Sequence, residues 1–198
     1  QETADAVSLV FDVPEDRRAD FEYKPGQFLT LRIPSEQTGS VARCYSLASS
    51  PHTGEPLKVT VKRTLDGYGS NWICDNVSAG HSIEVLPPAG VFTPVDLTEK
   101  LVLFAGGSGI TPVMSILESA LDRGNRNVVL VYGNRDENSV IFAERLRELA
   151  ARHSDALTVV HWLESVQGRP SAQQLATLVS TFTDHRAYMC GPGPFMDT

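Results

Sequence analysis

The chain has 198 residues, of which 41% are hydrophobic and 21% charged, and its formal net charge is −7. This composition is typical of a globular protein with one large or two small domains. The negative charge and the lack of a basic stripe exclude nucleic acid as an expected partner. No apolar run approaches the roughly 18 residues of a membrane span and no signal-peptide pattern is present, so we expect a cytoplasmic protein without a membrane partner.

The cysteines and histidines indicate no metal site. The three cysteines, Cys44, Cys74 and Cys190, are far apart and odd in number, which favours a reducing compartment and no disulfide framework. Three scattered thiols cannot supply the four thiolates of an iron–sulfur cluster. The five histidines show no metal-ligand spacing.

Short strands separated by turns with Pro or Gly are predicted for the first half of the chain. The expected strands are residues 7–13, 27–33, 44–48, 57–63 and 82–86. A short helix is expected over residues 70–77, with Ser70 as its N-cap. Strands at this spacing favour an antiparallel barrel or sandwich.

Strands and helices alternate in the second half. The expected strands are residues 101–105, 128–132, 157–163 and 186–190. Helices are predicted from Thr111, over residues 140–151, and through Val179 after a capping box of Ser171 and Gln174. This order predicts a parallel sheet with right-handed crossovers. The pattern changes between residues 92 and 98, so the expected domains are residues 1–96 and 97–198.

A Gly-rich turn, G-G-S-G-I-T-P, joins the first strand of the second half to its helix. Gly106, Gly107 and Gly109 can take positive φ and allow close approach to the backbone. Thr111 and Pro112 are predicted as the N-cap and the first helical residue. A strand, a glycine turn and a helix N-terminus together favour an anion such as phosphate. Pro112 stands where the dinucleotide fingerprint needs Gly or Ala, and no Lys-Ser or Lys-Thr pair marks an ATP-type loop.

Three segments are expected at one edge of the parallel sheet, because ligands bind beyond the C-terminal ends of its strands. They are the glycine turn, Gly133-Asn134-Arg135, and Gly191-Pro192-Gly193-Pro194. Their meeting favours a ligand site over a plain strand-to-helix turn.

The chain resembles a known family over essentially its whole length. Three motifs carry the resemblance: Arg43-Cys44-Tyr45-Ser46, the glycine turn, and Cys190-Gly191-Pro192. They occur in the order seen in ferredoxin–NADP reductase-like flavoenzymes, and the segments 28–51, 134–142 and 161–168 are most similar to reductases that serve steroid hydroxylases. The resemblance implies an antiparallel flavin-binding β-barrel followed by a parallel-sheet, Rossmann-like domain for NAD(P).

The resemblance implies FAD as the cofactor of the first domain. Tyr45 would stack on the flavin ring, Arg43 would pair with a pyrophosphate oxygen, and Ser46 would hydrogen-bond near the reactive flavin N5. The full set of implied flavin-binding residues is Arg43, Tyr45, Ser46, Val61, Lys62, Arg63, Gly67, Gly69 and Ser70.

The second domain is implied to bind NADH, with NADPH as the alternative. Arg135 is suited to a 2′-phosphate, whereas Asp136 beside it opposes one. Ser46 and Cys190, the latter beside the nicotinamide, are the expected catalytic residues. The implied nucleotide-binding residues are Gly107, Ser108, Gly109, Thr111, Asn134, Arg135, Cys190, Gly191 and Pro192.

The implied activity is electron transfer from the nicotinamide nucleotide through FAD to a [2Fe–2S] centre, and then to a Rieske-type oxygenase partner. The chain ends at Thr198 without a ferredoxin domain, so we expect a monomeric fragment whose nucleotide domain is incomplete. The alternatives are a reductase of phenylacetate-type oxygenases, a flavohaemoglobin-like reductase, and a non-catalytic nucleotide-binding subunit.

Overall fold

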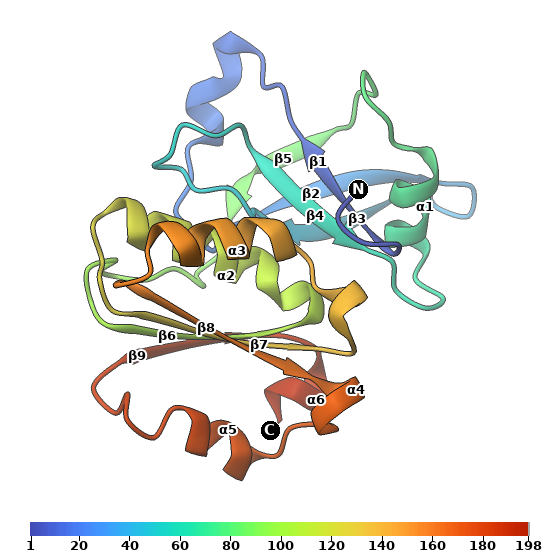
Figure 1. The fold of residues 1–198 in the computed structure, drawn as a ribbon. Helices are drawn as coiled ribbons and strands as arrows, with labels where there is room; N and C mark the ends of the chain where they lie inside the picture. The colour runs from blue at the N-terminus through green and yellow to red at the C-terminus, as the bar shows by residue number, and fades with distance from the viewer. Residues whose placement is uncertain (198) are drawn as a thin grey trace.

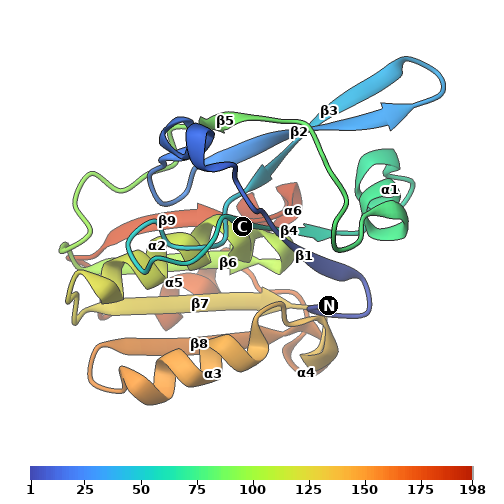
Figure 2. The ribbon, with the colours of Figure 1, turned by 90° about the horizontal axis from the view of Figure 1, so that it is seen from above.

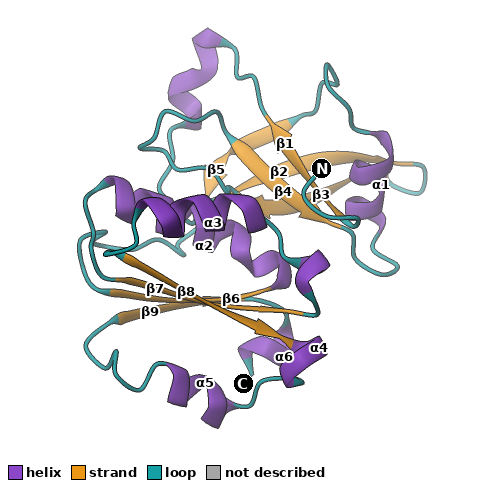
Figure 3. Cartoon of the chain, in the orientation of Figure 1, coloured by secondary structure: helices purple, strands orange, loops and turns teal. Residues whose placement is uncertain are grey.

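Antiparallel strands form the first half of the molecule and parallel strands the second (Figures 1 and 3). The computed structural model describes residues 1–197, so Thr198, the last residue of the predicted second domain, lies outside the described residues. Within residues 1–197, none of the helices has the length and hydropathy needed to cross a bilayer.

Two antiparallel sheets make up the first half. One pairs β1 (Ala6–Val10) with β4 (Lys58–Lys62), and the other has the order β3-β2-β5, with β2 (Phe28–Ser35) between β3 (Gly39–Ser46) and β5 (Val85–Ala89). A bridge between Leu47 and Val59 links them. All five predicted strands are present, and the β2–β3 hairpin extends away from the second half (Figure 2).

The predicted strand boundaries in this half are shifted. The strand expected at residues 44–48 is the end of the longer β3, which begins at Gly39. Gly39 has a φ of +74°, a conformation that suits glycine and turns the chain back against β2. A 3₁₀ helix at Glu15–Phe21 was not predicted; it contains no buried residue, so no apolar periodicity marks it.

The interior of the first half is filled by side chains from the inner faces of its strands, from Leu47 just after β3 and from Ile73 of the helix that follows β4. These fully buried residues are Leu29, Leu31, Ile33, Leu47, Val59, Val61 and Ile73. Alternate residues of β2 point into this core, as expected for a strand with one buried face.

Helix α1 (Tyr68–Asn76) follows β4, but Ser70 is not its N-cap. The N-cap residue is Gly67, and Ser70 lies in the first helical turn. The Ser70 hydroxyl accepts a hydrogen bond from the Thr64 N–H at 3.0 Å and contacts the Gly67 carbonyl oxygen at 3.4 Å. The predicted cap is therefore wrong, because this hydroxyl stabilises the loop before the helix.

A four-stranded parallel sheet forms the second half and confirms the predicted topology. Its order is β8 (Leu157–Leu163), β7 (Val128–Asn134), β6 (Leu101–Gly106) and β9 (Arg186–Cys190). Helices α2 (Ile110–Asp122) and α3 (Ala143–Arg152) cover the face toward the first half, and α5 (Ala172–Leu178) covers the other (Figure 1). Short helices follow β8 and β9: α4 (Glu164–Gln167) and α6 (Gly193–Met196).

Helix α3 begins later than predicted. The expected start was residue 140, but Phe142 has a φ of +62° and precedes the first helical residue, Ala143. The capping box at Ser171 and Gln174 is present at the start of α5, which confirms this local prediction.

The start of α2 also differs from the prediction. A 3₁₀ turn over Gly107–Gly109 runs directly into the helix, so Gly109 is the N-cap residue. Thr111 is the second helical residue and Pro112 the third, and the Thr111 hydroxyl donates to the Ser108 carbonyl oxygen at 3.1 Å. The predicted cap at Thr111 and first position for Pro112 are wrong for this reason.

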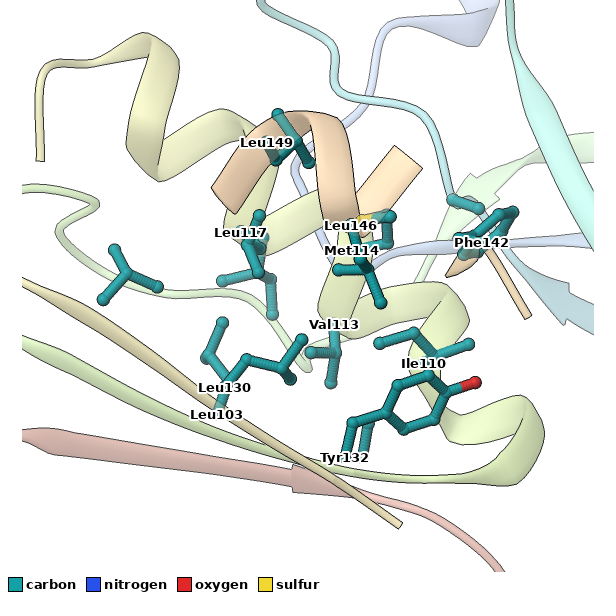
Figure 4. Close-up of a cluster of buried hydrophobic side chains, with 14 of the residues drawn as sticks. Leu103, Ile110, Val113, Met114, Leu117, Leu130, Tyr132, Phe142, Leu146 and Leu149 are labelled. Atoms are coloured by element: carbon teal, nitrogen blue, oxygen red, sulfur yellow. The ribbon is translucent and has the colours of Figure 1, made fainter. Parts of the chain in front are cut away.

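Helix α2 is buried from Ile110 to Leu121. One side packs on the sheet, where residues of β6 and β7 meet α2 and α3 (Figure 4). The other side meets the first half: the Ser115 hydroxyl donates to the Ser49 carbonyl oxygen at 2.6 Å. Ser119 and Ser50 also form a buried hydroxyl pair at 2.8 Å.

A charged group reinforces this contact between the halves. Arg145 of α3 donates to Glu118 of α2 at 2.6 Å and reaches Glu55 of the first half at 3.4 Å. Burial raises the pKa of Glu118, and the Arg145 guanidinium opposes that rise. The two halves are thus joined by specific polar bonds inside an otherwise apolar contact.

Leu103 in β6 provides a test of the packing, because it has no exposed surface. Leu103→Ala leaves a cavity and is expected to lower the free energy of unfolding by about 2–5 kcal/mol. Leu65→Ala is the control: that side chain is 91% exposed, so a change within about 0.5 kcal/mol is expected. Urea unfolding followed by circular dichroism measures both; equal losses would contradict the position of β6.

Candidate active site

A cleft of about 1000 Å³ runs between the two halves of the molecule. One wall comes from β3, the end of β4 and the start of α1; the other comes from the C-terminal ends of β6, β7 and β9. Every residue predicted to bind a cofactor lines this cleft except Val61, whose side chain is fully buried in the core of the first half. The structure therefore brings together two groups of residues that are far apart in sequence.

The aromatic group on the first wall is Tyr45. Burial raises the pKa of Tyr45 to about 12, while Arg43 opposes the rise, so the phenol is protonated at neutral pH. A Cβ at Gly69 would lie 2.9 Å from Arg43 Cγ and 3.6 Å from the Tyr45 hydroxyl oxygen. Glycine at this position therefore lets the start of α1 approach β3 closely.

The four predicted cationic side chains have different partners. Arg43 donates to the Ala42 carbonyl oxygen at 2.8 Å, and it has no carboxylate partner among residues 1–197. The other three are paired: Lys62 and Arg135 with Asp5, and Arg63 with Asp75. Arg43 is therefore the predicted cation best placed for an anionic ligand.

The glycine turn forms the second wall. A Cβ at Gly109 would lie 2.1 Å from the Cys190 carbonyl oxygen, so only glycine allows this close approach of α2 to the end of β9. Gly107 has a φ of +51° and open space beside it. The Thr111 hydroxyl and the Ile110 N–H are both bonded within the turn, so the backbone N–H groups of the turn over Gly107–Gly109 are the donors suited to an anion.

The two predicted catalytic residues lie on opposite walls. Ser46 ends β3, and Cys190 ends β9. Burial raises the pKa of the Cys190 thiol, so the thiol is protonated at neutral pH and is not an activated nucleophile. Their catalytic role stays a prediction.

Phe195 packs beneath the glycines of the second wall and also lines the cleft. It was not predicted. A Cβ added at Gly106, Gly133 or Gly191 would lie 2.6 to 3.3 Å from its ring. Gly106 ends β6, Gly133 is the last residue but one of β7 and Gly191 follows β9, so glycines at the strand ends accommodate this ring. Their position after each strand is the sequence signal that could have identified a common packing partner.

Asn134 is the clearest sign of a ligand on the second wall. This residue is only 5% exposed at the end of β7. Its side chain lies beside the Tyr132 hydroxyl, which donates to the Gly107 carbonyl oxygen, so neither Oδ1 nor Nδ2 has a partner of hydrogen-bond geometry within the described chain. An unpaired buried amide is costly. A bound nucleotide that contacts this amide would remove that cost.

A second hollow of about 810 Å³ adjoins the first wall and was also missed. It lies between the tip of the β2–β3 hairpin and α1, and shares Arg43 and Tyr68 with the main cleft. Trp72 lines it, and the Tyr68 hydroxyl donates to the Pro34 carbonyl oxygen at 2.6 Å. The hairpin tip shows only turn residues in the sequence, so no motif indicated this hollow.

Further residues line the cleft that were not predicted to bind a cofactor, and apart from Cys44 and Tyr68 they come from segments with no recognisable motif. No local pattern signals their meeting, which depends on the packing of the two halves. They are Asp5, Cys44, Thr60, Thr64, Asp66, Tyr68, Trp162, Glu164 and Pro170.

The fold and the cleft define an oxidoreductase with adjacent flavin and nicotinamide modules. The unpaired Arg43, the buried amide of Asn134 and the close glycine turn fit two nucleotide cofactors. The family model described as the oxidoreductase FAD-binding domain matches residues 1–93, and that described as the oxidoreductase NAD-binding domain matches residues 103–198. The two halves of the chain belong to these two oxidoreductase domain families, FAD-binding and NAD-binding in that order.

Particular relatives are similar over the whole chain. The 3-ketosteroid-9-alpha-monooxygenase ferredoxin reductase component of Rhodococcus rhodochrous is 66% identical over 100% of this chain and 56% of the relative. A component of the 1,2-phenylacetyl-CoA epoxidase of Escherichia coli is 31% identical over 99% of this chain and 59% of the relative. The chain therefore spans little more than half the length of these curated relatives.

A solved structure supports the same arrangement. The flavohaem-like FAD/NAD-binding domain of nitric oxide dioxygenase from Vibrio cholerae has a TM-score of 0.84 and 29% identity, covering 100% of this chain and 85% of that chain. Both halves of the molecule thus have counterparts in one known FAD/NAD-binding domain.

Gly109→Ala tests the close approach at the glycine turn. The new Cβ would overlap the Cys190 carbonyl oxygen, so the free energy of unfolding is expected to fall by about 1–3 kcal/mol. Gly193→Ala is the matched control, because nothing lies within 4 Å of its Cβ position. Chemical denaturation distinguishes the two; a stable Gly109→Ala variant would contradict the contact.

Proposed function

We propose that the chain is the FAD- and NADH-binding part of a reductase that supplies electrons to a 3-ketosteroid 9α-monooxygenase. One observation carries the proposal: the residues predicted to bind the flavin and those predicted to bind the nicotinamide nucleotide line facing walls of one cleft. The 66% identity to a steroid-monooxygenase reductase component, against 31% to the epoxidase component, supports the steroid assignment.

The first wall is suited to hold the flavin. Tyr45 offers a half-buried aromatic surface, and stacking on it is worth on the order of 1 kcal/mol. Arg43 is available to neutralise the pyrophosphate, and the start of α1, where Gly67 is the N-cap, points free N–H groups toward the same region. These contacts bind and orient the cofactor.

The second wall is suited to hold the nicotinamide nucleotide against the first. The turn before α2 binds phosphate through N–H groups, and Asn134 supplies an unpaired amide nearby. FAD held here would supply the chemistry that takes up a hydride from NADH and passes electrons on singly. Ser46 and Cys190 border the space between the walls, where they orient the two rings and exclude water.

The second hollow supports FAD rather than FMN as the flavin. It continues from Arg43 along Tyr68 and Trp72, so an adenosine attached beyond the pyrophosphate has an aromatic-lined space. FMN lacks that group and would leave the hollow unused.

The proposal extends to the organisation and surroundings of the protein. The division into residues 1–96 and 97–198 is supported by two buried clusters that each lie within one half, while a third cluster joins Ala6 and Ala48 of the first half to the core around α2. We propose a [2Fe–2S] centre as the electron acceptor and a Rieske-type oxygenase as the partner. We also propose a monomer, and a cytoplasmic location for it is supported by the three free cysteines.

Anaerobic reduction of the FAD-loaded chain tests the proposal. Mixing with NADH is expected to bleach the visible flavin absorbance, because the two walls hold both cofactors in one cleft. Flavin absorbance that persists although NADH binds would contradict hydride transfer. A chain that binds neither FAD nor FMN would contradict the flavoprotein assignment and favour a non-catalytic nucleotide-binding subunit.

A further inference from the structure

A carboxylate of the N-terminal segment is paired with an arginine of the nucleotide wall, and both residues belong to the lining of the cleft. Asp5 Oδ2 lies 3.1 Å from Arg135 Nη2, although the two residues are 130 positions apart. Asp5 belongs to the first half of the molecule, and Arg135 follows β7 in the second. Both line the cleft.

Asp5 is held more firmly than its partner. Its carbonyl oxygen accepts from the Arg63 N–H at 2.8 Å, and its Oδ1 accepts from the Thr3 hydroxyl at 2.8 Å. Lys62 Nζ lies 3.7 Å from Oδ2. The side chain of Asp5 is 30% exposed and that of Arg135 is 65% exposed, so the carboxylate is the fixed member of the pair.

Asp136, the neighbour of Arg135 in sequence, does not pair with the Arg135 guanidinium. Its carboxylate accepts from the Ser139 N–H at 2.9 Å and from the Ser139 hydroxyl at 2.8 Å. The carboxylate bonded to Arg135 is therefore that of Asp5. Glu164 also lines the cleft and is 3.9 Å from Arg169.

This pairing has a chemical consequence for the nucleotide. An arginine binds a phosphate best when two of its N–H groups are free to face the oxygens. At Arg135 one side of that fork is already bonded to Asp5. A phosphate monoester carries about −1.5 to −2 charges at neutral pH, so it would compete with the carboxylate and be repelled by it. A 2′-hydroxyl carries no charge to repel.

We propose that Asp5 is a specificity-determining residue, which disfavours nucleotides with a 2′-phosphate by holding Arg135 in an ion pair across the cleft. The inference rests on the proposed function, since it concerns the adenosine end of the same nucleotide site. It assigns the preference for NADH to a residue of the flavin half of the chain.

Calorimetric titration of the chain with adenosine 2′,5′-bisphosphate and with AMP tests the inference without any flavin turnover. Asp5→Asn keeps the shape of the side chain and removes its charge. The ratio of the dissociation constant of the bisphosphate to that of AMP is expected to fall about fivefold, as loss of a partly exposed ion pair permits. In the double variant Asp5→Asn/Arg135→Leu this ratio is expected to return to that of the unmodified chain or above it, because the arginine that would bind the 2′-phosphate is gone.

Asp184→Asn is the matched control. Asp184 pairs with Lys100 at 2.6 Å. Both residues precede strands of the parallel sheet, at the end away from the cleft, so this variant removes one negative charge at a distance from the cleft. Its ratio is expected to equal that of the unmodified chain. A similar fall of the ratio in Asp184→Asn would show a general charge effect and overturn the inference.

Two other results would also overturn it. An unchanged ratio in Asp5→Asn, while AMP still binds, would contradict the role of Asp5 and leave the proposed function standing. If the unmodified chain binds neither AMP nor the bisphosphate, both the inference and the proposed nucleotide site are wrong.

Discussion

The placement of α2 between the sheet and the first half of the molecule is the constraint on which the cleft depends. The helix is buried along nearly its whole length, and Ser115 and Ser119 join it to the first half through buried hydrogen bonds. These bonds have fixed directions, unlike apolar contacts, and therefore define how the halves are oriented. The glycine turn that begins α2 lies on one wall of the cleft because the helix is held in this position.

The same constraint explains why small residues line the second wall. Gly109 touches the carbonyl group of Cys190, and Phe195 packs against the glycines at the strand ends. Residues without large side chains let the backbone itself form the surface of this wall, so its N–H groups are exposed to a ligand. The opposite wall supplies an aromatic ring and a cation, Tyr45 and Arg43. The chemistry is thus divided between two halves, neither of which forms the cleft alone.

Local patterns in the sequence were sufficient for the positions of the strands along the chain and for the antiparallel and parallel character of the two halves, but not for the order of the strands within each sheet. The edge strands β8 and β9 have the predicted bounds although neither is fully buried, and the Ser171 cap depends only on residues three apart. The caps at Ser70 and Thr111 were wrong because turns before each helix use those hydroxyls. The contact of Asp5 with Arg135 could not be predicted, since only the packing of the halves brings them together.

The central claim is that the bonds along α2 hold the two walls at the separation that electron transfer requires. The most direct measurement is the rate of anaerobic flavin reduction by NADH in the double variant Ser115→Val/Ser119→Val, loaded with FAD. We expect the rate to fall by about tenfold or more, because small displacements are costly in positioned reactions, while Thr177→Val on the remote α5 leaves it unchanged. An unaltered rate in the folded double variant would contradict the account.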